Sequence, residues 1–283
     1  MIVRPPIDAE FIKKMLPPRN ANTHKGDYGK ILLLCGSRGY TGAAALSAMG
    51  ALRTGAGLVY LAVPESIYAI EATKLLEPVV IPLPDKDGMF AQAACDKVNS
   101  MISNMDGILI GPGIGQSNGP LSLLESVLNN AKCPVVVDAD GINILSRHKD
   151  ILRERTSPTI LTPHDGEFVR IFGHIAEDRC QCAADLATEL GCIVLLKGHR
   201  TIITDGDICY INQTGNPGMA KGGSGDVLAG MIVSLIGQGI APLEAAASAA
   251  WLHGRAGDLC ADSLGQYGML PQDMVNVLPK LLG

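Results

Sequence analysis

This sequence is short of charge, of aromatic residues and of long hydrophobic runs. Charged residues make up 18% and aromatic residues 4% of the 283 positions, whereas apolar residues make up 47% and glycine occurs 33 times. The high apolar content excludes a disordered chain. The net charge of −5 lacks the basic excess that is typical of nucleic-acid-binding proteins. Because no run of about 18 apolar residues occurs, we expect no membrane-spanning helix.

The chain also lacks targeting signals, paired cysteine motifs and a Walker A motif. The N-terminal segment has neither an apolar core nor a cleavage site, and this favours a cytoplasmic protein. The eight cysteines lie mostly in apolar segments, which is typical of free thiols in a reducing compartment. Cys180 and Cys182 form a C-x-C pair, but without a second pair or a histidine doublet they do not predict a metal site. The missing Walker A motif excludes a P-loop NTPase.

Short apolar segments alternate with helical patterns along the chain, and most of them are apolar on both faces, as in a buried parallel sheet. The strand candidates are Lys30–Cys35, Leu58–Val63, Val79–Leu83, Gly107–Ile110, Val135–Val137, Thr159–Leu161 and Cys192–Leu196. The helix candidates are Thr41–Thr54, Ser66–Leu76, Pro120–Asn130, Asp178–Leu190, Gly225–Gln238 and Pro242–Ala261. A hairpin of Thr201–Thr204 and Ile208–Ile211 should add an antiparallel edge. The alternation predicts one three-layer α/β/α domain over residues 1–283, with a mostly parallel sheet and residues 1–24 as a lead-in.

Glycines and carboxylates gather in the turns that follow the strands, where ligands bind in open α/β sheets. The richest turn is Asn216–Asp226, NPGMAKGGSGD, which runs directly into an apolar helix. Its glycines let several backbone N–H groups converge on one anion, which the positive end of the helix also attracts. Asp226 then has two interpretations. It either caps the helix at its N-cap position or accepts a proton from a hydroxyl that attacks a phosphate.

Four further turns each admit a binding and a structural interpretation. Gly111–Gly115, GPGIG, is either a ligand loop or a structural turn. Asp138 and Asp140 either hold Mg²⁺ through water or cap the next helix. The segment Thr162–Glu167 either contacts a substrate or supplies capping groups. The segment Lys197–Thr201 either contacts phosphate oxygens or is an exposed basic turn.

In this order, these segments resemble the ADP/ATP-dependent NAD(P)H-hydrate dehydratase family of the ribokinase-like superfamily. The resemblance runs from about Lys25 to Ala261. It is most specific at GNPGMA with GGSGD, within Gly215–Asp226, and at LTPH with GE, within Leu161–Glu167. The lead-in KGDYGK, Lys25–Lys30, supports it.

The resemblance implies a ribokinase-like fold and a carbon–oxygen lyase that repairs NADH or NADPH hydrated on the nicotinamide ring, as the S epimer. Such an enzyme phosphorylates the ring hydroxyl with ADP or ATP and then eliminates phosphate, which is a better leaving group than hydroxide. The catalytic base would be Asp226. The hydrated cofactor would contact Ala44, Gly115, His164 and Asp226. The nucleotide would contact Lys197, Gly198, His199, Arg200, Thr201 and Gly225. The anion hole would be Gly222, Gly223, Ser224 and Gly225.

The resemblance also implies Mg²⁺, a homotetramer and a separate epimerase protein, since residues 1–24 leave no room for an epimerase domain in this chain. It implies no direct protein ligand to the metal, which Asp138 and Asp140 would meet through water. A compact single-domain chain favours ADP over ATP. Two positions depart from the family pattern. Lys221 stands where a small residue or threonine is usual, and DGIN at Asp140–Asn143 replaces DALN.

Two other functions fit the same motifs. A small-molecule kinase of this superfamily would share the fold and the base but release a stable phosphate ester. A catalytically inactive nucleotide-binding regulator would share only the fold, and the intact GSGD sequence, Gly223–Asp226, disfavours it.

Overall fold

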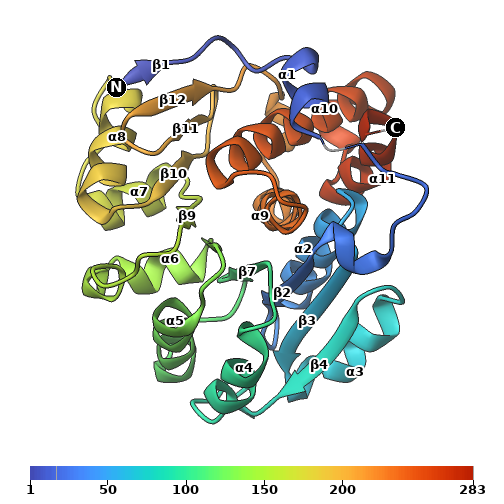
Figure 1. Ribbon diagram of the computed structural model, residues 1–283, viewed down its shortest axis with the longest axis vertical. Coiled ribbons are helices and arrows are strands. Elements are labelled where there is room, and N and C mark those ends of the chain that lie inside the picture. Colours follow the sequence, from blue (N-terminus) through green and yellow to red (C-terminus); the bar gives the residue numbers. More distant parts are fainter. Residues whose placement is uncertain (17, 283) are drawn as a thin grey trace.

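The computed structural model describes residues 1–16 and 18–282 and shows one large sheet between two layers of helices (Figure 1). The strand order in the sheet is β1-β12-β11-β10-β9-β8-β7-β2-β3-β4. These strands are β1 (Ile2–Val3), β2 (Lys30–Leu34), β3 (Leu58–Pro64), β4 (Val79–Leu83), β7 (Gly107–Ile110), β8 (Val135–Val137), β9 (Thr159–Leu161), β10 (Ile193–Leu196), β11 (Ile202–Thr204) and β12 (Ile208–Ile211). Among the described strands of this ten-stranded sheet, β11 alone runs antiparallel to all of its neighbours, so the predicted, mostly parallel sheet is confirmed.

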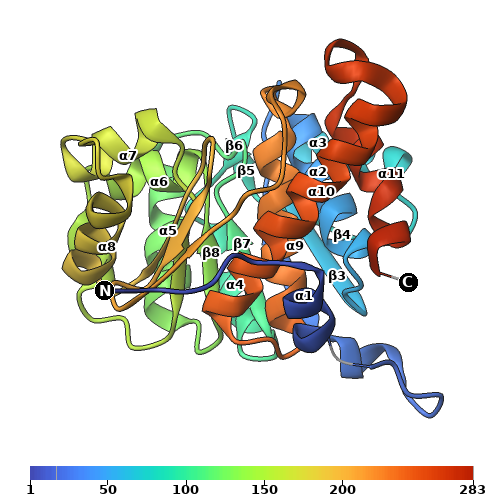
Figure 2. The same ribbon diagram turned by 90° about the horizontal axis from the view of Figure 1, so that it is seen from above.

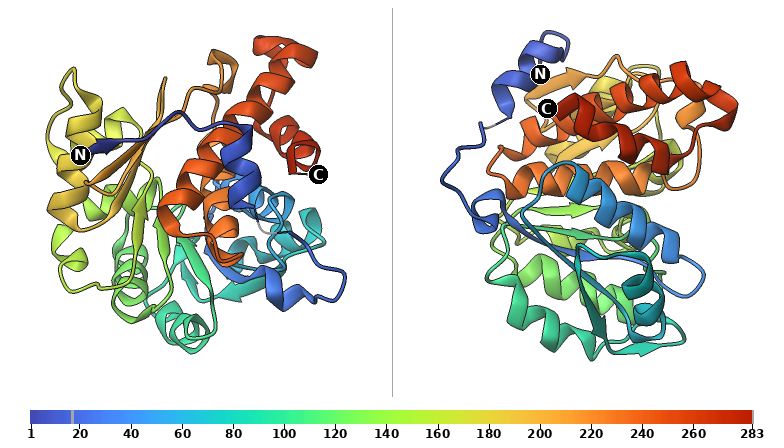
Figure 3. Two further views of the ribbon diagram at one scale, coloured as in Figure 1. Left: turned by 45° about the horizontal axis from the view of Figure 1, so that its top comes forward. Right: turned by 90° about the vertical axis from the view of Figure 1, so that its right-hand side faces the viewer.

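The side chains of each central strand alternate between two buried cores, one on each face of the sheet. In β2, for example, Ile31 and Leu33 face one core, whereas Leu32 and Leu34 face the other. The first core is covered by α1 (Ala9–Met15), α2 (Thr41–Arg53), α3 (Glu65–Lys74), α9 (Ser224–Gly237), α10 (Pro242–Gly268) and α11 (Pro271–Leu282). The second is covered by α4 (Ala94–Ile102), α5 (Asn118–Asn130), α6 (Asp140–Leu145), α7 (Asp165–Phe172) and α8 (Arg179–Leu190). The three-layer prediction is therefore confirmed, and Figure 3 shows the C-terminal helices in red gathered on their side of the sheet.

The N-terminal segment is more than a lead-in. Figure 2 shows it in blue, crossing the molecule from β1 to α1. Ile2 pairs with Ile208 in a parallel ladder, so β1 forms the outer edge of the sheet beyond the hairpin. The prediction that the hairpin itself is the sheet edge is therefore wrong, because two N-terminal residues pair with β12.

Several short elements were not predicted. They are the helices α1, α4, α6, α7 and α11, the 3-10 turns η1 (Lys25–Tyr28), η2 (Lys149–Leu152) and η3 (Pro217–Met219), and a small hairpin of β5 (Asp85–Lys86) with β6 (Met89–Phe90). Helices of this length depend on tertiary packing more than on their own sequence. The last long helix also extends beyond its predicted end at Ala261 to Gly268, across a kink at Gly265 with φ 72°.

Two expectations from composition bear on the whole chain. All eight cysteines are free thiols in the structure, as predicted. None of the helices in residues 1–16 and 18–282 combines the length and the apolar character needed to cross a bilayer.

Candidate active site

The predicted site residues come together because β7, β8, β9 and β10 are neighbours in the parallel part of the sheet. Their carboxyl ends lie at one edge, so the turns that follow them face a common space. The glycine-rich turn meets the same edge from α9. A Cβ built on Gly225 would lie 3.3 Å from Lys197 Nζ and 3.9 Å from Asp138 Oδ2. Residues that are distant in the sequence therefore form one candidate site.

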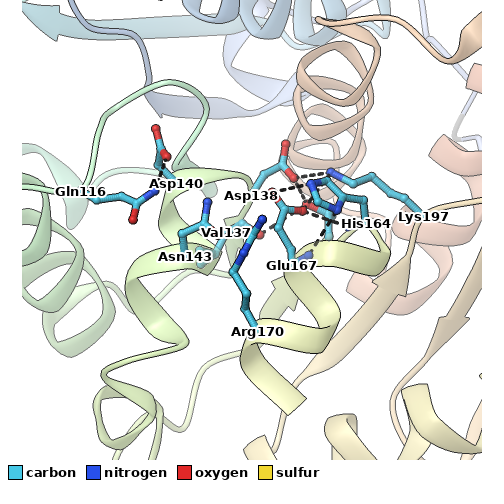
Figure 4. A network of polar contacts seen from close by, with 10 residues as sticks. Gln116, Val137, Asp138, Asp140, Asn143, His164, Glu167, Arg170 and Lys197 are labelled. Atoms are coloured by element: carbon cyan, nitrogen blue, oxygen red, sulfur yellow. Dashed lines mark hydrogen bonds and ion pairs between the residues drawn. The ribbon is translucent and has the colours of Figure 1, made fainter. Parts of the chain in front are cut away.

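A buried ion cluster lies at the centre of this edge (Figure 4). Asp138 is 1% exposed, and its Oδ1 accepts hydrogen bonds from Thr162 Oγ1 at 2.7 Å and Lys197 Nζ at 2.8 Å. The Lys197 ammonium also lies 3.8 Å from Glu167 Oε2. Burial by itself would lower the pKa of Lys197, but the Asp138 and Glu167 carboxylates raise it above its ordinary value. Lys197 therefore stays charged and neutralises two buried acids.

Lys197 is less exposed to solvent than the residues that directly follow it. Its side chain is only 19% exposed, so the interpretation of this segment as an exposed basic turn does not hold for Lys197. Gly198, His199 and Arg200 are exposed, and Thr201 Oγ1 closes the turn by donating to the Gly198 carbonyl at 3.0 Å. An exposed basic turn thus begins one residue after a partly buried lysine. The nucleotide contacts predicted for Lys197–Thr201 stay a prediction.

Asp226 is not the N-cap residue of α9. The helix begins at Ser224, and its N-cap is Gly223, whose φ of 97° lies in the left-handed region that favours glycine. The capping interpretation of Asp226 is therefore wrong, because the carboxylate stands two residues inside the helix. No hydrogen bond from any described residue reaches the Asp226 side chain, so its carboxylate is free to meet a ligand.

The surroundings of Asp226 make it a stronger base than an ordinary aspartate. Burial, with a smaller contribution from the nearby Asp138 carboxylate, raises the pKa of Asp226 from 3.8 to about 6 against the opposing effect of the Lys197 ammonium. A base whose pKa lies close to the working pH is still ionised at neutral pH and takes up a proton readily. Asp226 is thus suited to accept a proton from a substrate hydroxyl.

The first turn of α9 offers free backbone donors beside that carboxylate. Among residues 1–16 and 18–282, no acceptor is bonded to the N–H groups of Gly225 and Asp226. Gly222 is exposed and Gly223 and Gly225 are half-buried, so an anion can approach. These groups and the positive end of the helix have the features of an anion-binding turn, and the predicted anion hole stays a prediction.

Lys221, the unusual residue of this turn, points away from it. Its Nζ donates to the carbonyl oxygens of Tyr267 at 2.7 Å and Met269 at 2.6 Å. The ammonium therefore holds the connection between α10 and α11. Its charge is shared with two carbonyl dipoles and does not lie over the glycines.

The loop after β7 combines several glycines in the left-handed region with hydrogen bonds to one carboxylate. Gly111, Gly113 and Gly115 all have positive φ values. Asp140 holds the loop, because its Oδ2 accepts from the Gly115 N–H at 2.9 Å and its Oδ1 accepts from Gln116 Nε2 at 3.0 Å. The structural interpretation of this turn is confirmed. The substrate contact predicted for Gly115 stays a prediction, and its N–H is already bonded.

His164 caps α7, and this confirms the capping interpretation of its segment. Its Nδ1 accepts from the Glu167 N–H at 3.2 Å, while Glu167 Oε2 accepts from the His164 N–H at 2.9 Å. This reciprocal pair is a capping box. The imidazole is still 54% exposed, so it can also meet a ligand. Ala44, also predicted to contact the substrate, is fully buried in α2, so its side chain has no exposed surface for a ligand.

Two residues near the site were missed in the sequence. His253, from α10, is buried beneath the anion-binding turn with Nε2 3.5 Å from Ser224 Oγ, and burial lowers its pKa to about 4, so it is neutral. Arg179 begins α8 and pairs with Asp165 Oδ1 at 2.7 Å, and it donates to the Lys197 carbonyl at 3.2 Å. No motif marks either residue, because both act across elements that are far apart in the sequence.

Comparisons with known proteins agree over nearly the whole chain. The family model described as NAD(P)H-hydrate dehydratase matches residues 31–280. The chain is 43% identical, over 98% of its length, to a bifunctional NAD(P)H-hydrate repair enzyme of Moorella thermoacetica, and covers 53% of that protein. It spans about half the length of this and other bifunctional relatives. It is 35% identical to an ADP-dependent (S)-NAD(P)H-hydrate dehydratase of Bacillus subtilis, with 96% of this chain and 95% of that one covered.

Solved structures are also similar to this chain over nearly its whole length. A crystal structure of the ADP/ATP-dependent NAD(P)H-hydrate dehydratase from Bacillus subtilis, co-crystallised with ATP and Mg²⁺, superposes with a TM-score of 0.85 at 32% identity. The match covers 98% of this chain and 97% of that chain. A ribokinase-like superfamily protein of Enterococcus faecalis superposes with a TM-score of 0.87 at 27% identity, over 99% of this chain and 95% of that one. The predicted ribokinase-like fold is confirmed.

Proposed function

Because this chain belongs to the NAD(P)H-hydrate dehydratase family, we propose that it uses ADP or ATP to dehydrate NADH or NADPH hydrated on the nicotinamide ring. The observation that carries this proposal is the position of Asp226. Its carboxylate, with a pKa raised to about 6 by burial, stands beside the free N–H groups of the first turn of α9. A base and an anion-binding turn side by side are what phosphoryl transfer to a hydroxyl requires.

Each group of the site has one task in this reaction. Asp226 takes the proton of the ring hydroxyl while that oxygen attacks the terminal phosphorus of the nucleotide. The bond from this phosphorus to the rest of the nucleotide breaks, so AMP leaves from ADP or ADP leaves from ATP. The backbone N–H groups of Gly222, Gly223 and Gly225 hold the oxygens of the transferred group, whereas the Ser224 N–H already donates to the Lys221 carbonyl at 3.2 Å. Loss of inorganic phosphate and of a proton from the neighbouring ring carbon then restores the double bond. Lys197–Thr201 and Gly225 are proposed to bind the nucleotide, and Gly115 and His164 to line the hydrated-cofactor site; Ala44 is fully buried and offers it no surface.

We also propose that Mg²⁺ is held by the nucleotide phosphates and, through water, by Asp138. In the described part of the chain no group of three or more His, Cys, Asp or Glu side chains could hold the ion directly. Asp138 fits water-mediated binding better than Asp140, since both carboxylate oxygens of Asp140 already hold the loop after β7. When bound, the ion withdraws negative charge from the phosphates.

Removal of Mg²⁺ is expected to abolish turnover. The attacking oxygen must approach a group with several negative charges, and the Asp138 and Asp226 carboxylates add to that repulsion. Turnover should be measured in excess EDTA and again after Mg²⁺ is added back in excess. Full turnover in EDTA would show that the reaction needs no divalent ion.

The proposed reaction is tested by one assay. Purified protein is mixed with the S epimer of hydrated NADH, Mg²⁺ and either ADP or ATP, and both the near-ultraviolet absorption of the reduced ring and free inorganic phosphate are followed. We expect both signals to rise together, and faster with ADP. A stable phosphate ester without the absorption change would instead identify a small-molecule kinase. Nucleotide binding without either product would identify a regulator.

The remaining properties are proposals that rest on the family. We propose that the enzyme acts as a homotetramer in the cytoplasm and that a separate epimerase converts the R epimer into its substrate. Native mass spectrometry or light scattering of the purified chain would determine its oligomeric state.

The pH dependence should report on Asp226. Because burial raises the pKa of this carboxyl to about 6, kcat/KM should be constant at neutral pH and fall about tenfold per pH unit below about pH 6, as the base becomes protonated. The profile should be measured with the free enzyme far below saturation. A profile that stays flat down to pH 4.5 would show that ionised Asp226 is not required.

Replacement of His164 should separate its capping from its proposed substrate contact. In His164→Ala both are lost, so we expect a loss of about 1 kcal/mol in stability and a higher KM for the hydrated cofactor. His164→Asn is the matched control, because asparagine is a good N-cap residue. It should keep the stability and still raise KM, with nucleotide affinity unchanged. If nucleotide affinity falls instead, His164 belongs to the nucleotide half of the site.

A further inference from the structure

Two thiols from different layers of the fold meet outside the proposed active site. Cys180 is the second residue of α8, and its Sγ lies 3.7 Å from the Sγ of Cys209 in β12. Cys180 is half-buried, whereas Cys209 is fully buried. A disulfide needs a sulfur–sulfur distance of about 2.05 Å. The pair is therefore a small side-chain movement away from a covalent bond.

We propose that Cys180 and Cys209 form a reversible oxidation site, and that their disulfide weakens nucleotide binding at the turn after β10. The oxidant is a hydroperoxide. The second half of the proposal rests on the proposed function, whereas the first half does not.

Cys180 reacts with the peroxide first, and Cys209 then reacts with the oxidised Cys180. Cys180 can be reached from solvent, so its sulfur attacks the peroxide oxygen, the O–O bond breaks and water leaves, which gives a sulfenic acid. The Cys209 sulfur then attacks the Cys180 sulfur, the S–O bond breaks, and the leaving hydroxide departs as water with the Cys209 proton. The two thiols lose two electrons in all, and one hydrogen peroxide becomes two waters. Burial, together with the Cys180 sulfur, raises the pKa of Cys209 to about 12, so Cys209 stays protonated until it is used.

We expect α8, and not β12, to move when the disulfide forms. Cys209 is held within the sheet, since β12 pairs with both β1 and β11 and the Cys209 carbonyl accepts from the Arg4 N–H at 2.8 Å. Cys180 lies in the first turn of a helix on the outer layer. Bond formation should therefore draw this turn toward β12 while the strand stays in place.

Arg179 connects that turn to the proposed nucleotide site. It directly precedes Cys180, pairs with Asp165 Oδ1 at 2.7 Å and donates to the Lys197 carbonyl at 3.2 Å. Its guanidinium also lies over Gly198, where an added Cβ would be 3.0 Å from Nη2. Its buried Nε has no partner among the described residues, so the guanidinium is held only by these contacts. A shift of the first turn of α8 thus loosens the support of Lys197–Thr201.

The oxidation site is tested on the full chain without any nucleotide. Reduced protein is treated with hydrogen peroxide, digested and analysed by mass spectrometry. We expect one cross-linked peptide pair, Cys180 with Cys209, reversed by dithiothreitol. Cys209→Ala should stop at a sulfenic acid on Cys180, trapped by dimedone, and Cys133→Ser, at a half-buried cysteine elsewhere, should cross-link as the wild type does. Oxidation that leaves Cys180 and Cys209 unlinked would overturn the proposal.

The coupling is tested by two independent measurements on oxidised and reduced protein. Hydrogen exchange over residues 197–201 should speed up on oxidation in the wild type and stay unchanged in Cys209→Ala. ADP affinity by calorimetry should fall at least about fivefold on oxidation and recover on reduction. Unchanged exchange in fully cross-linked protein would overturn the coupling. If the reduced protein binds no ADP, the proposed function fails, whereas the cross-link and the exchange result still decide the inference.

Discussion

Asp226→Asn is expected to lower turnover at least about 100-fold, the lower end of what a general base contributes. Asparagine keeps the size of the side chain but cannot accept the hydroxyl proton at neutral pH. The N–H groups of Gly222–Gly225 are unaffected, so nucleotide binding should be retained. Turnover within about tenfold of the wild type would remove Asp226 as the base and leave the turn as a phosphate-binding site only.

The same substitution is expected to make the protein more stable, and this separates loss of chemistry from loss of fold. Burial raises the folded-state pKa of Asp226 from 3.8 to about 6, so between these pH values the folded protein holds a proton that the unfolded chain releases. Stability of the wild type therefore falls as the pH rises through this window. Above it, the buried charge costs on the order of 1–3 kcal/mol, which asparagine removes.

The stability change should be measured by urea unfolding at pH 7.5 and at pH 3.5. The variant should gain stability at the higher pH and almost none at the lower. Asp8→Asn is the matched control, since Asp8 is a true N-cap residue whose Oδ1 accepts from the Phe11 N–H at 2.8 Å. Asparagine caps as well as aspartate, so this control should change neither stability nor turnover.

Lys197→Ala is expected to cost about 3–5 kcal/mol of folding free energy, because it leaves the Asp138 and Glu167 carboxylates buried without their counter-charge. From the sequence, a lysine at a strand end was expected to affect nucleotide binding much more than the fold, with a binding loss of roughly 1.5–3 kcal/mol. Because Lys197 pairs with Asp138, a carboxylate that is only 1% exposed, the expected loss of folding free energy is larger than the expected loss of nucleotide-binding free energy.

Two further variants make this prediction decisive. Lys149→Ala removes an ion pair of similar length, 3.0 Å to Glu189, in which the side chains are 34% and 46% exposed, and should cost less than about 1 kcal/mol. The double variant Lys197→Ala with Asp138→Asn removes one unpaired charge and should recover part of the loss. Urea unfolding gives the stabilities, and ADP calorimetry on the double variant, compared with Asp138→Asn alone, gives the binding contribution of Lys197. If Lys197→Ala is as mild as Lys149→Ala, the ion cluster does not support the fold.

Much of the fold was predictable because it depends on local patterns. The strands β2, β3, β7, β8, β9 and β10 are mostly Val, Ile and Leu and are largely buried on both faces, a pattern that is typical of the strands of a parallel sheet. The helices α6 and α7 were missed because they begin inside Asp138–Asn143 and Thr162–Glu167, where polar residues suit a turn, a cap or a ligand equally well. The pairing of β1 with β12 was missed because two residues carry no periodicity.

The sequence by itself determined the fold class, the family and the residues that collect at the carboxyl ends of the strands, because periodicity and motif order are local properties. Only the tertiary structure decided what those residues do. Asp138 and Lys197 are 59 positions apart, so their pairing exists only once the strands are side by side. Whether Asp226 or Gly223 caps α9 depends on one backbone angle, and whether Asp226 can act as a base depends on its burial beside a second carboxylate. Charge, burial and hydrogen bonding set a side chain's chemistry, and all three are fixed by neighbours that the order of residues does not reveal.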